Sequence, residues 1–122
     1  MAKQNRKQQR TIRHQRIRKT IYGTTEIPRM SVCCTNNNIH IQFIDDINGK
    51  TITATSSIEP EFRKELNGKR PTVEQSKTLA GTAAKRALDS NIKKAVVDRG
   101  GFKYHGRIQA IAETMRENGI KL

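Results

Sequence analysis

The sequence predicts a single domain of the α/β (α+β) class, with a mixed sheet, two main helices on one face and a basic N-terminal arm. Three observations support this fold. Early segments of the chain alternate apolar and polar residues, or are rich in Thr and Ile, as strands are. Two later segments repeat apolar residues at helical spacing, with a short apolar run between them. Residues 1–22 carry eight Lys or Arg and no acid, which sets them apart from the rest.

Residues 1–22 form the predicted arm, and residues 23–122 form the globular part. The chain has a net charge of +13, whereas the globular part carries sixteen basic and eleven acidic residues, a net of +5. Because the arm has few apolar groups to bury, we expect it to be disordered when alone. As a helix it would place cations at three- and four-residue steps along one face. This charge asymmetry predicts an acidic polymer as partner.

Three strands are expected in the first half of the globular part. They span Arg29 to Thr35, Ile39 to Asp45 and Lys50 to Ser57. Asn36 to Asn38 and the pair Asn48-Gly49 supply turn chemistry between them, which indicates an antiparallel meander. One face of the meander must pack on helices. The other is polar enough to face water or a partner.

The second half of the globular part is predicted to contain a helix, a strand and a second helix. Residues 58–70 read as a polar connection, after which Thr72 and Gln75 form a capping box at a helix that ends near Ser90-Asn91. Its predicted inward residues are Val73, Ala80, Ala83, Ala84, Ala87 and Leu88. A fourth strand is expected at Ala95 to Val97. The last helix begins near Ile108, buries Ile108, Ile111, Ala112 and Met115, and stops at Gly119.

The loop from Asp98 to Arg107 is the stretch richest in binding chemistry. Its cations are Arg99, Lys103 and Arg107, and its rings are those of Phe102, Tyr104 and His105. Gly100 and Gly101 allow another backbone to approach closely. Cations interleaved with rings suit a phosphate backbone with bases beside it. The alternative is a tight strand-to-helix turn with solvated charges, in which one of Phe102 and Tyr104 fastens the loop to the body.

Enzymatic readings are weaker. A phosphate loop needs Lys and then Ser or Thr after its last glycine, but Arg107 and Ile108 follow Gly106. A metal-dependent nuclease is kept as an alternative, because Asp45, Asp46 and Asp98 end predicted strands and paired carboxylates could hold two ions. Equally, the first two could form a turn, and Asp98 could pair with Arg99 or Arg107 or cap the loop.

Other partner classes are disfavoured. Adjacent Cys33 and Cys34 point to opposite faces of a strand, so they are badly placed to share a metal, and they indicate a reducing compartment. No apolar run approaches the roughly 18 residues that span a bilayer. An anionic membrane surface is a less favoured partner than an acidic polymer, because the arm has too few sizeable apolar groups for a deep amphipathic anchor. The absence of helix-turn-helix, zinc-finger and RNP patterns favours folded RNA over a DNA sequence, although a generic DNA-binding protein remains an alternative. No cofactor or small-molecule substrate is expected.

Arg29-Met30-Ser31-Val32, the Ile39 to Asp46 stretch and the Asp98 to Arg107 loop together resemble the bacterial-type large ribosomal subunit protein 18 family, over nearly the whole chain. The resemblance implies a non-catalytic protein that binds 5S rRNA and helps attach it to 23S rRNA in the central protuberance. It implies neighbouring large-subunit proteins as further partners, with ribosomal protein 5 as a candidate. It implies an arm that is helical on RNA, a cytoplasmic ribosome with an organelle ribosome as the alternative, and Mg²⁺ bound only by the RNA.

The residues expected to contact RNA lie in the arm, the first hairpin and the loop. They are Lys3, Arg6, Lys7, Arg10, Arg13, His14, Arg16, Arg18, Lys19, Arg29, Asn36, Asn37, Asn38, His40, Arg99, Gly100, Gly101, Lys103, Tyr104, His105 and Arg107. The first hairpin departs from the family. It has Cys33-Cys34 where Phe-Arg is usual, Asn37-Asn38 where Lys-His is usual, and His40 where an aromatic is common. Asn bonds phosphate or ribose more weakly than a cation does.

Overall fold

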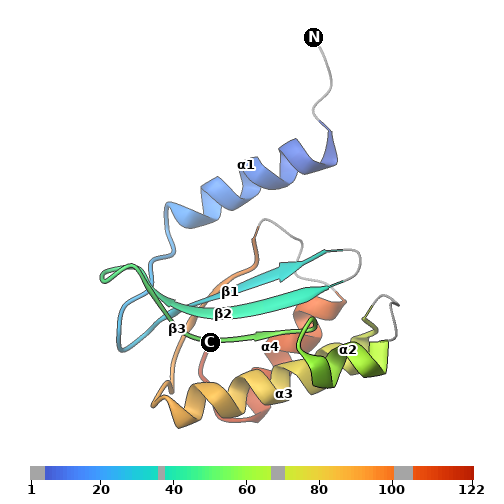
Figure 1. Cartoon of the computed structure of the whole chain (residues 1–122). Coiled ribbons are helices and arrows are strands. Elements are labelled where there is room, and N and C mark those ends of the chain that lie inside the picture. The colour runs from blue at the N-terminus through green and yellow to red at the C-terminus, as the bar shows by residue number, and fades with distance from the viewer. Residues whose placement is uncertain (1–4, 36–37, 67–70, 101–105) are drawn as a thin grey trace.

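A computed structural model describes residues 5–35, 38–66, 71–100 and 106–122, with the side chains of residues 65 and 66 left out. Figure 1 shows a sheet with one helix on one side and the remaining helices on the other. The elements are α1 (Arg6–Arg18), β1 (Arg29–Cys34), β2 (Ile39–Asp45), β3 (Lys50–Ser56), α2 (Pro60–Leu66), α3 (Val73–Asp89), β4 (Val96–Asp98) and α4 (Arg107–Glu117). The predicted α/β domain with a mixed sheet is confirmed.

The sheet has the strand order β3-β2-β1-β4. β1 pairs antiparallel with β2, and β2 with β3, as the meander prediction requires. β4 pairs parallel with β1, so the last strand lies beside the first one rather than beside β3. β4 ends one residue later than expected, and this puts Asp98 opposite Ser31. The end of β4 therefore brings a carboxylate to the middle of β1.

The core lies between the sheet and the pair α3 and α4. Alternate residues of β1 and β2, including Met30, Val32, Ile41 and Phe43, are buried against these helices. On α3 the buried residues are Ser76, Leu79, Ala80, Ala83, Ala84 and Ala87. The small side chains let the α3 backbone approach the sheet closely. The helices on one face and the polar strand residues on the other match the predicted layers.

Two residues of α3 that were predicted to face the core are exposed. Val73 and Leu88 are 43% and 40% exposed, so assigning them to the core was wrong. Val73 opens the helix, before its first buried residue, Ser76. Leu88 follows Ala87 by one position, about 100° around the helix, which turns it away from the buried stripe.

The segment predicted as a polar connection contains the short helix α2. Pro60 occupies its first position, where the missing N–H would have no helical partner in any case. Phe62 is buried in the core cluster and anchors the helix. One aromatic residue among charged ones gave too little periodicity to predict a helix from the sequence.

The predicted ends of the two main helices are confirmed. Thr72 Oγ1 accepts a hydrogen bond from Gln75 N–H at 3.2 Å, and Gln75 Oε1 accepts from Thr72 N–H at 2.9 Å. This reciprocal pair satisfies two N–H groups at the start of α3. After α4, Gly119 has a φ of 94°, a conformation that side chains rarely adopt.

The arm contains α1, which has no buried residue and lies across the sheet from α3 and α4 (Figure 1). Its start is a capping box that sequence reasoning missed, with Asn5 Oδ1 accepting from Gln8 N–H at 2.8 Å and Asn5 N–H donating to Gln8 Oε1 at 2.9 Å. The disorder of the isolated arm stays a prediction. Among the described residues, no helix combines the length and apolar character that a membrane crossing requires.

Gly23 marks a close approach between the arm's exit and the sheet. A Cβ placed on Gly23 would collide with the backbone nitrogen of Arg29 and the backbone oxygen of Ile44. We expect Gly23→Ala to lower the free energy of unfolding by about 1–3 kcal/mol, as overpacked sites do, measured by urea denaturation.

Gly81→Ala is the matched control for this substitution. A Cβ on Gly81 meets no atom within 4 Å. Because Gly81 lies inside a helix, this change should raise the free energy of unfolding by about 0.5–1 kcal/mol. Equal stability of Gly23→Ala and wild type would contradict the close approach.

Candidate nucleic-acid interface

Arg29 joins three neighbouring strands through its guanidinium. The residue opens β1 and is 9% exposed. Its Nε and Nη2 donate to the two carboxylate oxygens of Asp46 at 3.0 and 3.1 Å, just after β2. Its Nη1 donates to Asp98 Oδ2 at 2.6 Å, at the end of β4. One planar cation thus holds the ends of β2 and β4 to β1.

The same two carboxylates hold the arm. His14 Nε2 lies 3.0 Å from Asp98 Oδ2, and Arg18 Nη1 lies 3.4 Å from Asp46 Oδ2. Gly23 N–H donates to Asp46 Oδ2 at 2.8 Å, just beyond the helix. We call Arg29, Asp46, Asp98, His14 and Arg18 the charge network. It fixes α1 against the edge of the sheet that β1 and β4 form.

The network keeps its carboxylates ionised. Hydrogen bonds from Arg29 lower the pKa of Asp46 to about 2, although its partial burial acts in the opposite direction. Burial of Asp98 would raise its pKa, but bonds from Gly100 N–H, His14 and Arg29 outweigh burial and hold that pKa below the usual range. Burial likewise lowers the pKa of Arg29, and the two carboxylates more than reverse this. Arg29, Asp46 and Asp98 are therefore charged at neutral pH.

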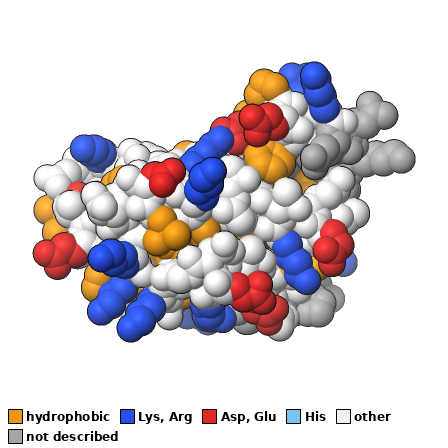
Figure 2. Space-filling view, turned by 90° about the horizontal axis from the view of Figure 1, so that it is seen from below, with side chains coloured by type: hydrophobic (Ala, Val, Ile, Leu, Met, Phe, Trp, Pro, Cys, Tyr) orange, Lys and Arg blue, Asp and Glu red, His pale blue; other side chains and the backbone are white. Residues whose placement is uncertain are grey.

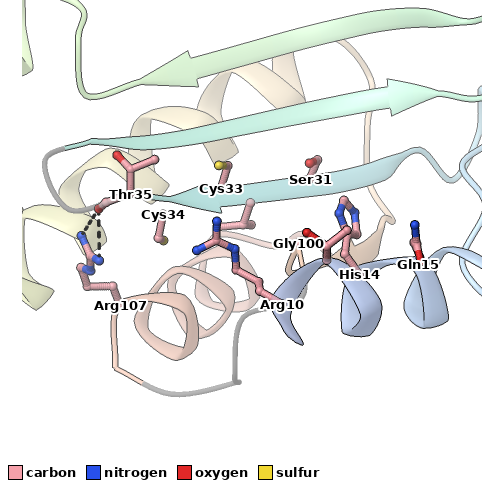
Figure 3. A pocket seen from close by; sticks show the side chains of 11 residues that line it. Arg10, His14, Gln15, Ser31, Cys33, Cys34, Thr35, Gly100 and Arg107 are labelled. Atoms are coloured by element: carbon pink, nitrogen blue, oxygen red, sulfur yellow. Dashed lines mark hydrogen bonds between the residues drawn. The ribbon is translucent and has the colours of Figure 1, made fainter. Parts of the chain in front are cut away.

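A groove of about 640 Å³ separates α1 from β1, and we call it the α1 groove (Figure 3). Its lining residues are Arg10, Thr11, His14 and Gln15 of α1, Ser31 to Thr35 of β1 and its exit, Gly100 and Arg107. The α1 wall carries Arg10 and hydrogen-bonding groups, whereas the β1 wall is uncharged and mixes two hydroxyl residues with Val32 and two cysteines. At one end both terminal nitrogens of Arg107 lie 3.4 Å from Thr35 O. An elongated anion would meet Arg10 on one wall, neutral groups on the other and Arg107 at the end.

The polar surface continues from the groove across the sheet. His40 and Gln42 of β2 are the register partners of Cys33 and Ser31, so they share the face turned away from the core. His40 Nδ1 lies 2.8 Å from Ser56 Oγ of β3, which fixes the ring on this face. Cys33 is exposed and Cys34 is buried, so their predicted opposite orientation is confirmed. Ser31, His40 and Gln42 bring hydrogen-bonding groups to this face, and the nearby carboxylates of Asp46 and Asp98 are bonded to Arg29.

The structure brings together some of the residues predicted to contact RNA and not others. Along α1 lie Arg6, Lys7, Arg10, Arg13, His14, Arg16 and Arg18, and Lys19 follows directly. Arg99 and Gly100 are half-buried at the start of the loop. Asn38 is turned inward, because its N–H donates to Thr35 Oγ1 and its Oδ1 accepts from Ser57 Oγ, both at 3.1 Å. Arg29 is also turned inward, with its guanidinium used by Asp46 and Asp98.

Several predictions fall on residues outside the described ranges. They concern Lys3, Asn36, Asn37, Gly101, Lys103, Tyr104 and His105, and the role of Phe102 or Tyr104 in fastening the loop. The loop is described only at its ends. Asp98 Oδ1 accepts from Gly100 N–H at 3.0 Å, so Asp98 caps the loop, as one of the alternatives held.

Asp98 pairs with Arg29 and His14, not with Arg99 or Arg107 as the sequence suggested. Sequence reasoning missed this pairing because the partner strand of β4 is not encoded locally. The same contacts weaken the nuclease reading, since Arg29 already neutralises Asp46 and Asp98. Asp45 accepts from Thr25, Asn48 and the backbone of Ile47 instead. Within the described residues, no three His, Cys, Asp or Glu side chains gather as metal ligands.

Comparison with known proteins decides the family. A family model for the ribosomal L18 proteins of archaea, bacteria, mitochondria and chloroplasts matches residues 4–122. The chain belongs to the ribosomal L18 family. Large ribosomal subunit protein uL18 of Thermotoga petrophila is 45% identical over 121 residues, covering 99% of this chain and 98% of the relative. The uL18 of Clostridium tetani is also 45% identical, over 119 residues, covering 98% and 97%.

Membership of this family confirms the resemblance noted from the motifs. L18 proteins are structural constituents of the ribosome, so this chain is a ribosomal protein and not an enzyme. The α1 groove and the open sheet face are consequently candidates for binding rRNA, and the charge network positions them.

Removing one buried carboxylate tests the network. Asp98→Asn should lower the free energy of unfolding by about 3 kcal/mol, the low end for a broken buried pair, because Arg29 keeps Asp46. Urea denaturation measures the change. Asp89→Asn, at an exposed position, should stay within about 0.5 kcal/mol of wild type. Equal effects of the two substitutions would show that the network does not stabilise the fold.

The depressed pKa values predict acid sensitivity. Asp46 titrates at about 2 in the folded protein against an ordinary 3.8, so below 3.8 the unfolded chain binds more protons. The stabilisation from Asp46 is complete above 3.8 and is lost as the pH falls toward about 2. Urea midpoints measured from about pH 6 down to about pH 2 should show this loss, with a shallower decline in Asp46→Asn. Identical dependence of the urea midpoint on pH in wild type and Asp46→Asn would show that Asp46 does not cause the acid sensitivity.

Proposed function

We propose that this protein binds 5S rRNA and helps attach it to 23S rRNA in the central protuberance of the large subunit of a bacterial, cytoplasmic ribosome. One observation carries the proposal. An acid-free cationic helix is held beside the sheet face that carries Ser31, His40 and Gln42, and the α1 groove runs between them. The names of the bacterial relatives, which are large-subunit proteins, support the assignment to that subunit.

The cations of the arm bind the RNA phosphates in this proposal. α1 and the residue after it carry Arg6, Lys7, Arg10, Arg13, Arg16, Arg18 and Lys19. Each cation that meets a phosphate releases condensed counterions, which supplies affinity without reading sequence. Selection for folded RNA then comes from shape, because a helix and a sheet set at a fixed distance accept only certain backbone paths.

The open sheet face supplies the less charged contacts. Ser31 offers a hydroxyl, Gln42 offers an amide and His40 offers a ring with one nitrogen bonded to Ser56. Such groups bond ribose hydroxyls and base edges at short range. For Arg29 we propose a positioning role, because its guanidinium holds Asp98, which in turn contacts His14 of α1.

The same assignment implies partners besides 5S rRNA. We expect 23S rRNA and neighbouring proteins of the central protuberance, with ribosomal protein 5 as a candidate. Magnesium would be held by the RNA.

Charge removal on α1 tests the proposal. A variant with Arg6→Gln, Arg10→Gln and Arg13→Gln should bind 5S rRNA more weakly, and its slope of log K against log salt should be smaller by roughly 2 to 3. Filter binding over a salt series measures both. The control carries Lys50→Gln, Lys64→Gln and Lys77→Gln, which remove equal charge from exposed residues outside α1. If the control bound 5S rRNA as weakly as the α1 variant, the loss of affinity would reflect net charge rather than the position of the cations on α1.

Competition with duplex DNA distinguishes the proposed function from that of a generic basic DNA-binding protein. Wild-type protein should prefer 5S rRNA over duplex DNA at matched salt, because shape selection adds to the charge term. Equal affinity would favour a generic basic DNA-binding protein.

A further inference from the structure

We propose that another protein docks at the end of the sheet where the turn between β2 and β3 meets the segment before β1. The partner contributes an apolar segment that places a Lys or Arg against Glu26. We call the exposed apolar residues at this end, Tyr22, Ile27 and Ile47, the sheet-end patch. The inference rests on the proposed function, since it assigns a surface to one of the protein partners expected beside the RNA.

The sheet-end patch gathers apolar side chains that remain in water. Tyr22 is 57% exposed, Ile47 is 62% exposed and Ile27 is 38% exposed. They are three of the seven large hydrophobic residues that are exposed in the described part of the chain. The two segments that carry them lie at the same end of the sheet, on the left of Figure 1. Single exposed apolar residues are ordinary, whereas a group at one place marks an interaction site.

Hydrogen bonds tie the two segments to each other. Tyr22 Oη donates to the backbone oxygen of Asp46 at 3.2 Å, directly before Ile47 in the chain. Thr25 Oγ1 donates to Asp45 Oδ2 at 2.7 Å. The patch therefore spans one joined structure, built from the arm's exit and the end of β2.

Each segment is also fixed internally. The Asp45 carboxylate accepts from Asn48 Nδ2 at 2.7 Å and from Ile47 N–H at 3.0 Å. On the other segment, Thr24 N–H donates to Ile27 O at 2.9 Å, and Ile27 N–H donates to Thr24 Oγ1 at 3.0 Å. Because these bonds hold the backbone of both isoleucines before a partner arrives, docking costs less conformational entropy.

The charge at this end favours a protein over RNA. Residues 20–28 and 39–49 contain no Lys or Arg, although the chain has 24. Glu26 is exposed and forms no ion pair with a described cation, and Lys50 follows the turn. The free charges here therefore nearly cancel, and the surface lacks the cationic excess that attracts phosphate. The exposed carboxylate of Glu26 instead complements a Lys or Arg of a protein.

The residue types at this end match the centre and the rim of a protein interface. A Tyr side chain presents a large apolar body with a polar tip, and Tyr is enriched among the residues that dominate binding energy. Ile27 and Ile47 add aliphatic surface on either side of the junction. Exposed Thr25 and Asn48 supply the polar rim that such interfaces have.

The face of α3 and α4 is a weaker candidate. Figure 2 shows charged side chains of both signs spread over this face, with separate hydrophobic groups between them. The exposed apolar residues of α3 are Val73 and Leu88, at opposite ends of the helix. They are roughly 20 Å apart at the rise of an α-helix, so they do not form one patch.

Photo-cross-linking from position 47 tests the inference. The full-length chain is expressed in its own cells with benzoylphenylalanine in place of Ile47, and purified large ribosomal subunits that contain it are irradiated. Mass spectrometry should identify a cross-linked protein segment that carries apolar residues and a Lys or Arg. In the matched control the label replaces Gln15, in the α1 groove, and should react with rRNA.

Charge reversal tests the role of Glu26. In the chain labelled at position 47, Glu26→Lys should lower the yield of the protein cross-link about tenfold, because the partner's cation then meets a like charge. Glu117→Lys, at an exposed position at the end of α4, should leave the yield unchanged. Urea denaturation checks that both variants are folded. Equal yields from the two variants would overturn the proposed recognition.

The outcomes separate this inference from the proposed function. A cross-link from position 47 to rRNA or to an acidic protein segment overturns the inference, and so does the absence of a cross-link from that position. If the label at position 15 fails to react with rRNA while position 47 reacts with a basic, apolar protein segment, the proposed function fails and the docking site stands.

Discussion

The structure depends on one guanidinium placed between two carboxylates. Arg29 is almost fully buried, and a buried cation is unfavourable unless its donors find partners. Asp46 and Asp98 provide them from opposite neighbours of β1 in the sheet. Removing either acid leaves part of the buried guanidinium without its partner, whereas an apolar trio of similar volume could be as stable. What the ion pairs add is specificity, because they fix which strands adjoin and where α1 rests.

The basic residues thus divide into two groups with different physical roles. Arg29 is turned inward and lends its charge to the scaffold, and Arg18 does so in part through Asp46. Arg6, Lys7 and Arg16 are exposed on α1 and remain available to a ligand. Net charge alone could not separate these groups, since each residue contributes equally to the total of +13. Burial and the location of the acids separate them.

Sequence reasoning succeeded where the signal is local. The Thr72 capping box, the Gly119 stop and the alternation along β1 and β2 each depend on a few neighbouring residues, and each was found. It also missed the local capping box at Asn5, but its larger failure lies where the signal is distant. That Asp98 meets Arg29 follows from β4 lying parallel beside β1, and no local pattern encodes that choice. For the same reason the α1 groove was not foreseen, although the polar face and the basic helix that form it were both predicted.

The parallel pairing of β4 with β1 has a consequence for the order of folding. The Arg29 to Asp98 bond spans 69 residues and the His14 to Asp98 contact spans 84. Contacts this distant form slowly, because a long loop must close before they stabilise anything. During synthesis, the β1–β3 meander can form before Asp98 has left the exit tunnel. The arm accordingly docks late, and until then its cations are free to meet whatever RNA lies near the emerging chain.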